Sequence, residues 1–184
     1  GVAQQVVEYA PCPVIVVRAP YGGVRNLLMV VDGSVQSEEA VGFLEKFPFS
    51  QEAMVHLLHV LPPVPSAEVF ARAFPGTPEA IYYPLPEDLR NLDQLVAEEE
   101  ASGKALLEKM QARLEVAGVF ARMFLVRGDA ATEILDFVKE NEVDLVVAGS
   151  RGLGGLEGWL LGSVSRKLVH YAGCSVLIVK KSAG

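Results

Sequence analysis

Short apolar runs alternate with amphipathic segments along most of this chain, and this alternation restricts its fold more than any other feature. Runs of this length predict strands buried on both faces, and the segments between them repeat apolar residues at helical spacing. Parallel strands need a crossover, usually a right-handed helix, so the pattern predicts a doubly wound α/β domain with a five-stranded parallel sheet. The predicted strands are residues 26–32, 53–60, 119–126, 143–148 and 176–180.

Turn and capping residues mark the expected ends of the helices. Ser34 follows the first strand and Gly33, and it is the predicted N-cap of a helix. Gly118 is predicted to end the helix marked by Leu106, Leu107, Met110 and Leu114, and Ser163 to cap the last one. Ligands in such sheets bind beyond the carboxyl ends of the strands, where Asp32, Val60 and Gly149 are expected.

Composition excludes several classes of protein. The 184 residues are 51% apolar, which is enough for a buried core, and 16 Lys and Arg against 23 Asp and Glu give a net charge of −7. An acidic chain disfavours binding to nucleic acid or to an anionic membrane surface. No apolar run reaches the roughly 20 residues that span a bilayer, so we expect no direct membrane contact by this chain. The two cysteines, Cys12 and Cys174, are expected to be small buried apolar residues in a reducing, cytoplasmic setting.

An internal repeat predicts the domain organisation. A shift of 162 residues aligns 2–18 with 164–180, and seven of the seventeen positions are identical. We therefore interpret residues 1–18 as the last helix and strand of a preceding domain, 19–25 as a linker, and 26–184 as a complete domain. Chance similarity between two helix-strand units is the alternative.

A glycine-rich loop between a predicted strand and a predicted helix is the main candidate for ligand binding. It begins with Gly149, Arg151 and Gly152 and ends with Gly162 and Ser163. Backbone amides freed by glycine, together with a helix N-terminus, favour a bound phosphate. The spacing matches neither the Walker A loop nor the dinucleotide loop, which would follow the first strand.

These motifs together resemble the universal stress protein family. The resemblance rests on the strand that ends in Asp32-Gly33-Ser34, on Leu57-Leu58-His59-Val60, on Gly128-Asp129-Ala130 and on the Gly-x2-Gly-x9-Gly-Ser motif that ends in Gly162-Ser163. That motif resembles the ATP-binding branch of the family, and the resemblance implies a Rossmann-like sheet of strand order 3-2-1-4-5.

The resemblance implies a binding role for ten residues, and Arg151 is added as an eleventh because it lies within the glycine motif and is expected to reach the phosphates. The first three would contact adenine and ribose, the next two would lie behind the ribose, and the others would surround the phosphates. These residues are Val31, Asp32, Val60, Ala148, Gly149, Arg151, Gly152, Gly162, Ser163, Val164 and Ser165. Two alternatives remain: Asp32 as a turn residue that only caps the next helix, and Arg151 as a solvated surface residue.

The expected ligand is ATP, or alternatively AMP, ADP or a cyclic adenine nucleotide, with any Mg²⁺ held through the phosphates. No nucleophile or base is identifiable, which favours a regulatory binding module of the stress response over an enzyme. A slow Mg²⁺-dependent ATPase, self-phosphorylation at Ser163 or Ser165, and an interaction module that binds no nucleotide remain as alternatives.

Pairing at the fifth strand is the expected route of self-association, because dimers of the family resemble one another in this contact. Residues 13–17 would pair with 176–180, within the chain or between two chains. The natural protein would be a tandem stress protein or the cytosolic part of a larger membrane protein. The Pro-rich and aromatic-rich segment at about 61–93 is an insertion that acts as a lid or partner surface, or that only packs on the domain.

Overall fold

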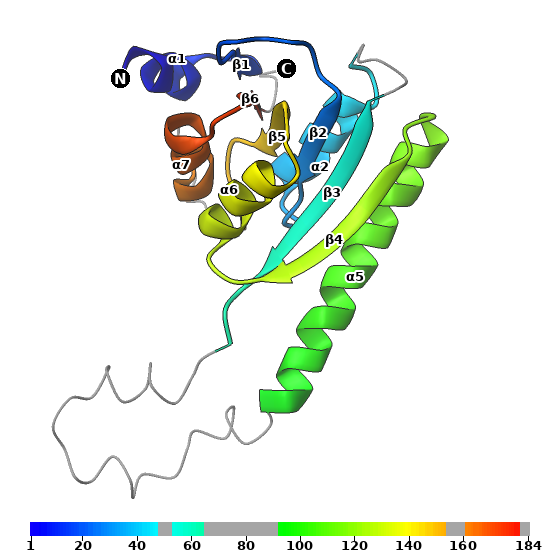
Figure 1. The fold of residues 1–184 in the computed structure, drawn as a ribbon. Helices are drawn as coiled ribbons and strands as arrows, with labels where there is room; N and C mark the ends of the chain where they lie inside the picture. The colour runs from blue at the N-terminus through cyan, green and yellow to red at the C-terminus, as the bar shows by residue number, and fades with distance from the viewer. Residues whose placement is uncertain (48–52, 65–91, 154–160, 181–184) are drawn as a thin grey trace, which may run out of the picture.

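The computed structural model describes residues 1–47, 53–64, 92–153 and 161–180, and it confirms a doubly wound α/β fold (Figure 1). Its helices and strands alternate along the chain as the sequence predicts. The helices are α1 (Val2–Tyr9), α2 (Val35–Leu44), α5 (Leu92–Val116), α6 (Ala130–Glu140) and α7 (Ser163–Tyr171). The strands are β1 (Val14–Val16), β2 (Asn26–Val30), β3 (Met54–Leu61), β4 (Ala121–Arg127), β5 (Leu145–Gly149) and β6 (Ser175–Val179).

The six strands form one sheet in the order β1-β6-β5-β2-β3-β4. The five strands β2 to β6 are parallel, and their order is the predicted 3-2-1-4-5. The strand β1 runs antiparallel to β6, with Ile15 opposite Leu177. The predicted pairing at the fifth-strand edge is therefore present, and it lies within one chain.

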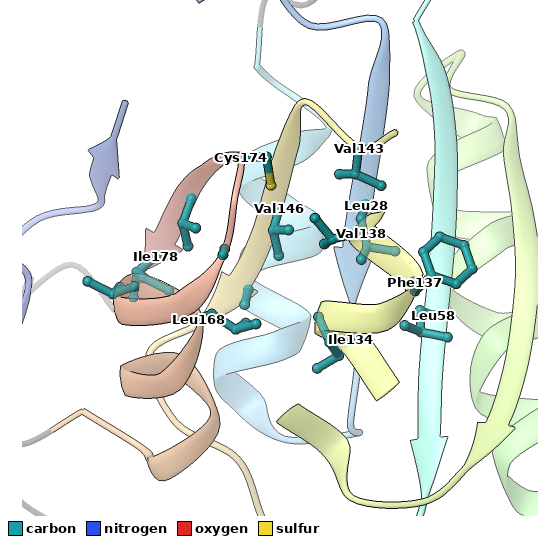
Figure 2. Packing of buried hydrophobic residues seen from close by; sticks show 14 of the residues in the cluster. Leu28, Leu58, Ile134, Phe137, Val138, Val143, Val146, Leu168, Cys174 and Ile178 are labelled. Atoms are coloured by element: carbon teal, nitrogen blue, oxygen red, sulfur yellow. The ribbon is translucent and has the colours of Figure 1, made fainter. Parts of the chain in front are cut away.

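The central strand β2 divides the core into two layers by simple alternation of its side chains. Leu27 and Met29 pack with apolar residues of α2 and α5 on one face. Leu28 faces the other way and joins residues of α6 and α7, the cluster seen in Figure 2. All three side chains are fully buried, which explains why this segment reads as a continuous apolar run.

Local turn chemistry sets the ends of two helices as expected. Ser34 is the N-cap of α2, and its side chain accepts a hydrogen bond from the backbone N–H of Ser37. Gly33, just before the cap, has φ +80°, and Gly118, which follows α5, has φ +79°. Both values lie in the left-handed region, where glycine carries no steric penalty.

Two expectations need correction. The predicted capping residue Ser163 is the first residue of α7, and the N-cap is Gly162, without a side-chain hydrogen bond. Cys12 is exposed, whereas Cys174 is buried as predicted, and burial raises the pKa of the Cys174 thiol to about 11.

Most of the predicted insertion, residues 65–91, lies outside the described part of the chain. Among the described helices, none is both long and apolar enough to cross a bilayer.

A buried histidine without a hydrogen-bond partner lies under α6. His56 is 4% exposed, and both ring nitrogens lack a partner within the described residues. Its ring lies 5.5 Å from the rings of Phe124 and of Phe137, so it packs as a third aromatic ring. Burial lowers the pKa of His56, and the nearby charge of Arg122 lowers it further.

We expect the free energy of unfolding to decrease as the pH falls below about 6.5, because the unfolded chain then takes up a proton at His56 that the folded chain does not. Urea unfolding at about pH 8 and about pH 5.5 measures this loss. The loss should be smaller in His56→Leu, which cannot bind a proton at this position. It should be unchanged in the control His170→Gln, since His170 is exposed on α7. An equal pH dependence in His56→Leu and in the unsubstituted protein would contradict this account.

Candidate functional site

The carboxyl ends of β2, β3 and β5 meet at one edge of the sheet, where they form the floor of a cavity of about 360 Å³. Val31 and Asp32 follow β2 directly, Val60 belongs to the end of β3, and Ala148 and Gly149 end β5. Parallel pairing holds these three strand ends side by side, as the rule for doubly wound sheets anticipates.

All eleven residues that the sequence nominated line this one cavity. The structure thus brings together positions that are as far apart in the chain as 31 and 165. They are Val31, Asp32, Val60, Ala148, Gly149, Arg151, Gly152, Gly162, Ser163, Val164 and Ser165.

Five further residues line the cavity that sequence reasoning did not nominate: Val30, Ser37, Ala130, Ile134 and Leu153. Val30 is the last residue of β2, and its position at a strand end could have identified it as a lining residue. Ala130 and Ile134 are four residues apart on α6, so one face of that helix contributes both. Helical spacing assigns Ile134 to the core, and Ala130 entered only as part of the Gly128-Asp129-Ala130 motif, so neither was nominated for the cavity.

The carboxylate of Asp32 is held in place by Ser34. Oδ1 of Asp32 accepts hydrogen bonds from the backbone N–H of Ser34 at 3.0 Å and from its hydroxyl at 2.6 Å. The same hydroxyl lies 3.3 Å from the carbonyl oxygen of Arg151, so it also touches the glycine-rich loop. Within the described residues Oδ2 accepts no hydrogen bond, and it faces Gly152, where an added Cβ would lie 2.5 Å from it.

Two hydrogen bonds close the base of the glycine-rich loop. The backbone N–H of Gly162 donates to the carbonyl of Ser150 at 2.9 Å, and the hydroxyl of Ser165 donates to the carbonyl of Gly149 at 2.8 Å. The Ser165 hydroxyl hydrogen is thus engaged inside the protein. What the start of α7 offers the cavity is the set of backbone N–H groups of its first turn, which have no acceptor within the helix. Residues 154–160, which include Trp159, lie outside the described residues.

The apolar wall of the cavity is rigid where β2 ends. The backbone N–H of Val31 donates to the carbonyl of Leu58 at 2.9 Å. Nδ1 of His59 lies 2.8 Å from the carbonyl oxygen of Val31, and since a carbonyl only accepts, the ring donates from Nδ1. Val60 and Ala148 supply small apolar surfaces nearby, which suits the face of a flat ring.

The charges around the cavity are few and of both signs. Asp32 and Arg151 are the charged side chains among the described lining residues. Lys180 does not line the cavity, and its pKa is lowered first by burial and then by the charge of Arg151. At the start of α6, a hydrogen bond from the hydroxyl of Thr132 holds the pKa of Asp129 below its usual value. No three His, Cys, Asp or Glu side chains among the described residues cluster closely enough to hold a metal ion.

Fold and cavity together define a doubly wound α/β protein with a cavity at the carboxyl ends of its strands. The sequence profile of the universal stress protein family matches residues 23–180, and this chain belongs to that family. It is similar to universal stress protein YxiE of Bacillus subtilis, with 34% identity over 85% of this chain and 99% of that protein.

Solved structures share the fold. The structure of MJ0577 from Methanocaldococcus jannaschii has a TM-score of 0.67 at 23% identity, over 88% of this chain and 99% of that one. A universal stress protein solved with cAMP has a TM-score of 0.59 at 22% identity, over 86% and 98% of the two chains. The Arabidopsis thaliana protein At3g01520, solved with AMP, has a TM-score of 0.55 at 26% identity, over 86% and 92%.

A longer solved protein matches nearly the whole of this chain. The universal stress protein from Archaeoglobus fulgidus has a TM-score of 0.62 at 16% identity, over 98% of this chain but only 55% of its own. The alignment thus takes in the segment before residue 23, which the family profile leaves out.

Replacement of Gly149 by alanine should destabilise the fold. An added Cβ would lie 2.8 Å from the backbone carbon and 2.9 Å from the backbone oxygen of Gln36 in α2, and backbone atoms cannot move aside cheaply. We expect Gly149→Ala to lower the free energy of unfolding by about 1–3 kcal/mol in urea titrations. The matched control is Gly173→Ala, because a Cβ there meets nothing within 4 Å. Equal stability of the two variants would show that β5 and α2 are less closely packed than described.

Loss of the Ser34 hydroxyl should also lower stability. Ser34→Ala removes both the N-cap of α2 and a hydrogen bond to Asp32, and we expect a loss of about 1 kcal/mol in the free energy of unfolding. Ser102→Ala is the control, since Ser102 is exposed within α5 and caps nothing. If Ser34→Ala unfolds at the same urea concentration as the control, the cap contributes nothing.

Proposed function

We propose that this chain binds an adenine nucleotide in the cavity at the strand ends, with ATP as the first candidate, and that it acts as a regulatory module of the stress response. One observation carries the proposal: a carboxylate oxygen of Asp32 with no described partner, a glycine-rich loop and the start of a helix all face a single cavity. The relatives solved with AMP and with cAMP support the choice of an adenine nucleotide.

The residues fit the base and the ribose of such a ligand. Val60, Ala148 and Ile134 offer apolar surface to a flat ring. The Oδ2 atom of Asp32 can accept a hydrogen bond from a ribose hydroxyl, while Ser34 holds Oδ1 and thereby sets the direction of the carboxylate.

The phosphates would lie at the start of α7. The backbone N–H groups of Ser163, Val164 and Ser165 belong to the first helical turn, and the partial positive charge of a helix N-terminus favours an anion there. Arg151 adds a positive charge on the same side of the cavity. Any Mg²⁺ would then be held through the phosphates.

Binding, rather than hydrolysis, is the function that we propose. Asp32 is the single carboxylate among the described lining residues, and its two hydrogen bonds from Ser34 engage Oδ1 in the folded protein. A ligand that joins Asp32 to Arg151 would bridge the β2–α2 turn and the glycine-rich loop. Nucleotide binding would therefore favour one arrangement of that loop, which is how a regulatory signal would arise.

Calorimetric titration with ATP, AMP and cAMP, with and without Mg²⁺, tests the proposal. The sharpest variant is Gly152→Ala, because its Cβ would push the Asp32 carboxylate out of its place beside Ser34. Only the end of one side chain has to move, so we expect a stability loss of about 1 kcal/mol at most and a folded protein. We expect at least about a tenfold loss of affinity, equivalent to about 1.4 kcal/mol.

Gly173→Ala is again the control, and it should bind as the unsubstituted protein does. Failure of the unsubstituted protein to bind any of the three nucleotides would overturn the proposal. Equal binding by Gly152→Ala and by the control would remove Asp32 from the site.

A further inference from the structure

One polar side chain interrupts the apolar face that β3 turns toward α5. Side chains along β3 alternate between the two faces of the sheet, so His59 shares its face with Leu57 and Leu61. Both leucines are buried, with 0% and 5% of their surface exposed. The next residue, Val60, points the other way and lines the cavity. His59 therefore lies behind the wall of the cavity, at a position where packing alone does not explain an imidazole.

Helix α5, which lies along β3 and β4, makes room for this ring (Figure 1). Gly103 is buried within the helix, and a Cβ added to it would lie 3.0 Å from Cδ2 of His59 and 2.9 Å from Cδ1 of Leu125. Apart from proline, glycine is the residue least suited to the interior of a helix. The close approach of the imidazole to α5 explains why a glycine stands here.

The ring of His59 is hydrogen-bonded to the residue that precedes Asp32. Its Nδ1 donates to the carbonyl oxygen of Val31 at 2.8 Å. Val31 follows β2 directly, and its backbone N–H donates to the carbonyl of Leu58 at 2.9 Å. Pairing with β3 thus holds the N–H of Val31, and the imidazole holds its carbonyl.

This contact fixes the peptide group from which the Asp32 side chain departs. The carbonyl of Val31 and the N–H of Asp32 belong to one planar unit. His59 holds the carbonyl, and the N–H donates to the hydroxyl of Ser37 at 3.4 Å. Beyond the peptide, Ser34 holds Oδ1 of the carboxylate, so that Oδ2 faces the glycine-rich loop. Three side chains thus set the direction of the carboxylate, and His59 does so from behind the sheet.

We propose that His59 is a positioning residue of the nucleotide site, which holds the peptide between Val31 and Asp32 and thereby directs the Asp32 carboxylate toward the ribose. The ribose enters this inference through the proposed function, whereas the hold on the peptide does not depend on it. His59 touches no ligand. Because its ring is seated against α5, the affinity for a nucleotide also depends on how α5 packs on the sheet.

A purely structural role for His59 leads to a different expectation. If the ring only fills space beside Gly103, its removal lowers the stability of the fold and weakens every nucleotide to the same extent. If the ring acts through Asp32, the loss of affinity is confined to ligands whose ribose hydroxyls can bind the carboxylate. A comparison of two nucleotides that differ in these hydroxyls separates the two roles.

Calorimetric titration of His59→Leu with ATP and with 2′,3′-dideoxy-ATP makes this comparison. Leucine keeps an apolar contact with α5 but donates no hydrogen bond. We expect the affinity for ATP to fall about tenfold and the affinity for dideoxy-ATP to change less than about twofold. When Asp32→Ala is already present, His59→Leu should change the affinity for ATP less than about twofold, because both substitutions act through one carboxylate.

Gln111→Leu is the matched control. Nε2 of Gln111 donates to the carbonyl oxygen of Ala121 at 2.7 Å, so this variant also removes a hydrogen bond from a side chain to a backbone carbonyl between α5 or β3 and a neighbouring segment, but away from the cavity. We expect it to lower stability without changing the affinity for ATP.

His59→Asn should restore the site. The amide nitrogen of asparagine is separated from Cα by as many bonds as Nδ1 of histidine, and it can donate to the same carbonyl. We expect this variant to bind ATP within about threefold of the unsubstituted protein. His59→Gln, whose donor lies one bond farther out, takes the place of His59→Leu if the leucine variant does not fold.

Hydrogen exchange at the backbone N–H of Asp32 measures the hold of His59 in the absence of nucleotide. We expect this exchange to be at least about fivefold faster in His59→Leu than in the unsubstituted protein or in Gln111→Leu.

Equal losses of affinity for ATP and dideoxy-ATP would overturn the proposal, and so would an undiminished effect of His59→Leu in the Asp32→Ala protein. Unchanged exchange at Asp32 would overturn it as well. If the unsubstituted protein binds no nucleotide, the proposed function fails, and exchange at Asp32 alone decides whether His59 holds the peptide.

Discussion

Burial of the central strand β2 on both faces and along both edges is the constraint on which the rest of the structure depends. Leu27, Leu28 and Met29 have no exposed surface, and β2 pairs in parallel with β3 and with β5. Parallel pairing forces the carboxyl ends of these strands to one edge of the sheet, and the polar turn after β2 must lie there too. The packing of the core therefore determines the position of the cavity, independently of which residues line it.

One hydroxyl couples the two loops that border this cavity. Ser34 caps α2, directs Asp32 and approaches the carbonyl oxygen of Arg151, so helix stability and cavity geometry share the same few atoms. Two glycines nearby likewise serve both the packing of the fold and the shape of the cavity. Gly149 lets β5 approach the backbone of α2, and Gly152 leaves room for a carboxylate oxygen.

The sequence predicted the features that depend on local pattern or on direct repetition. Apolar runs identified the strands now seen as β2, β3, β5 and β6, and β4 was predicted although Arg122 interrupts its apolar residues. The repeat of 2–18 in 164–180, together with the family resemblance, predicted the pairing at the sheet edge. The sequence did not predict features that depend on tertiary surroundings. Gly162, and not Ser163, is the N-cap of α7, and its backbone N–H is held by the carbonyl of Ser150 at the other end of the loop between β5 and α7. The exposure of Cys12 depends on which elements lie around it. Ala130 and Ile134 line the cavity because of where α6 crosses the sheet, which spacing does not reveal.

The direction of β1 carries a geometric consequence. Every strand from β2 to β6 points its carboxyl end toward the cavity, and β1 alone points the opposite way. A sheet that grew beyond β1 by parallel addition would therefore reverse its polarity at the β1–β6 seam. The carboxyl ends of the added strands would lie on the side of the sheet opposite the cavity, and the three residue pairs of that seam would join the two parts of the sheet.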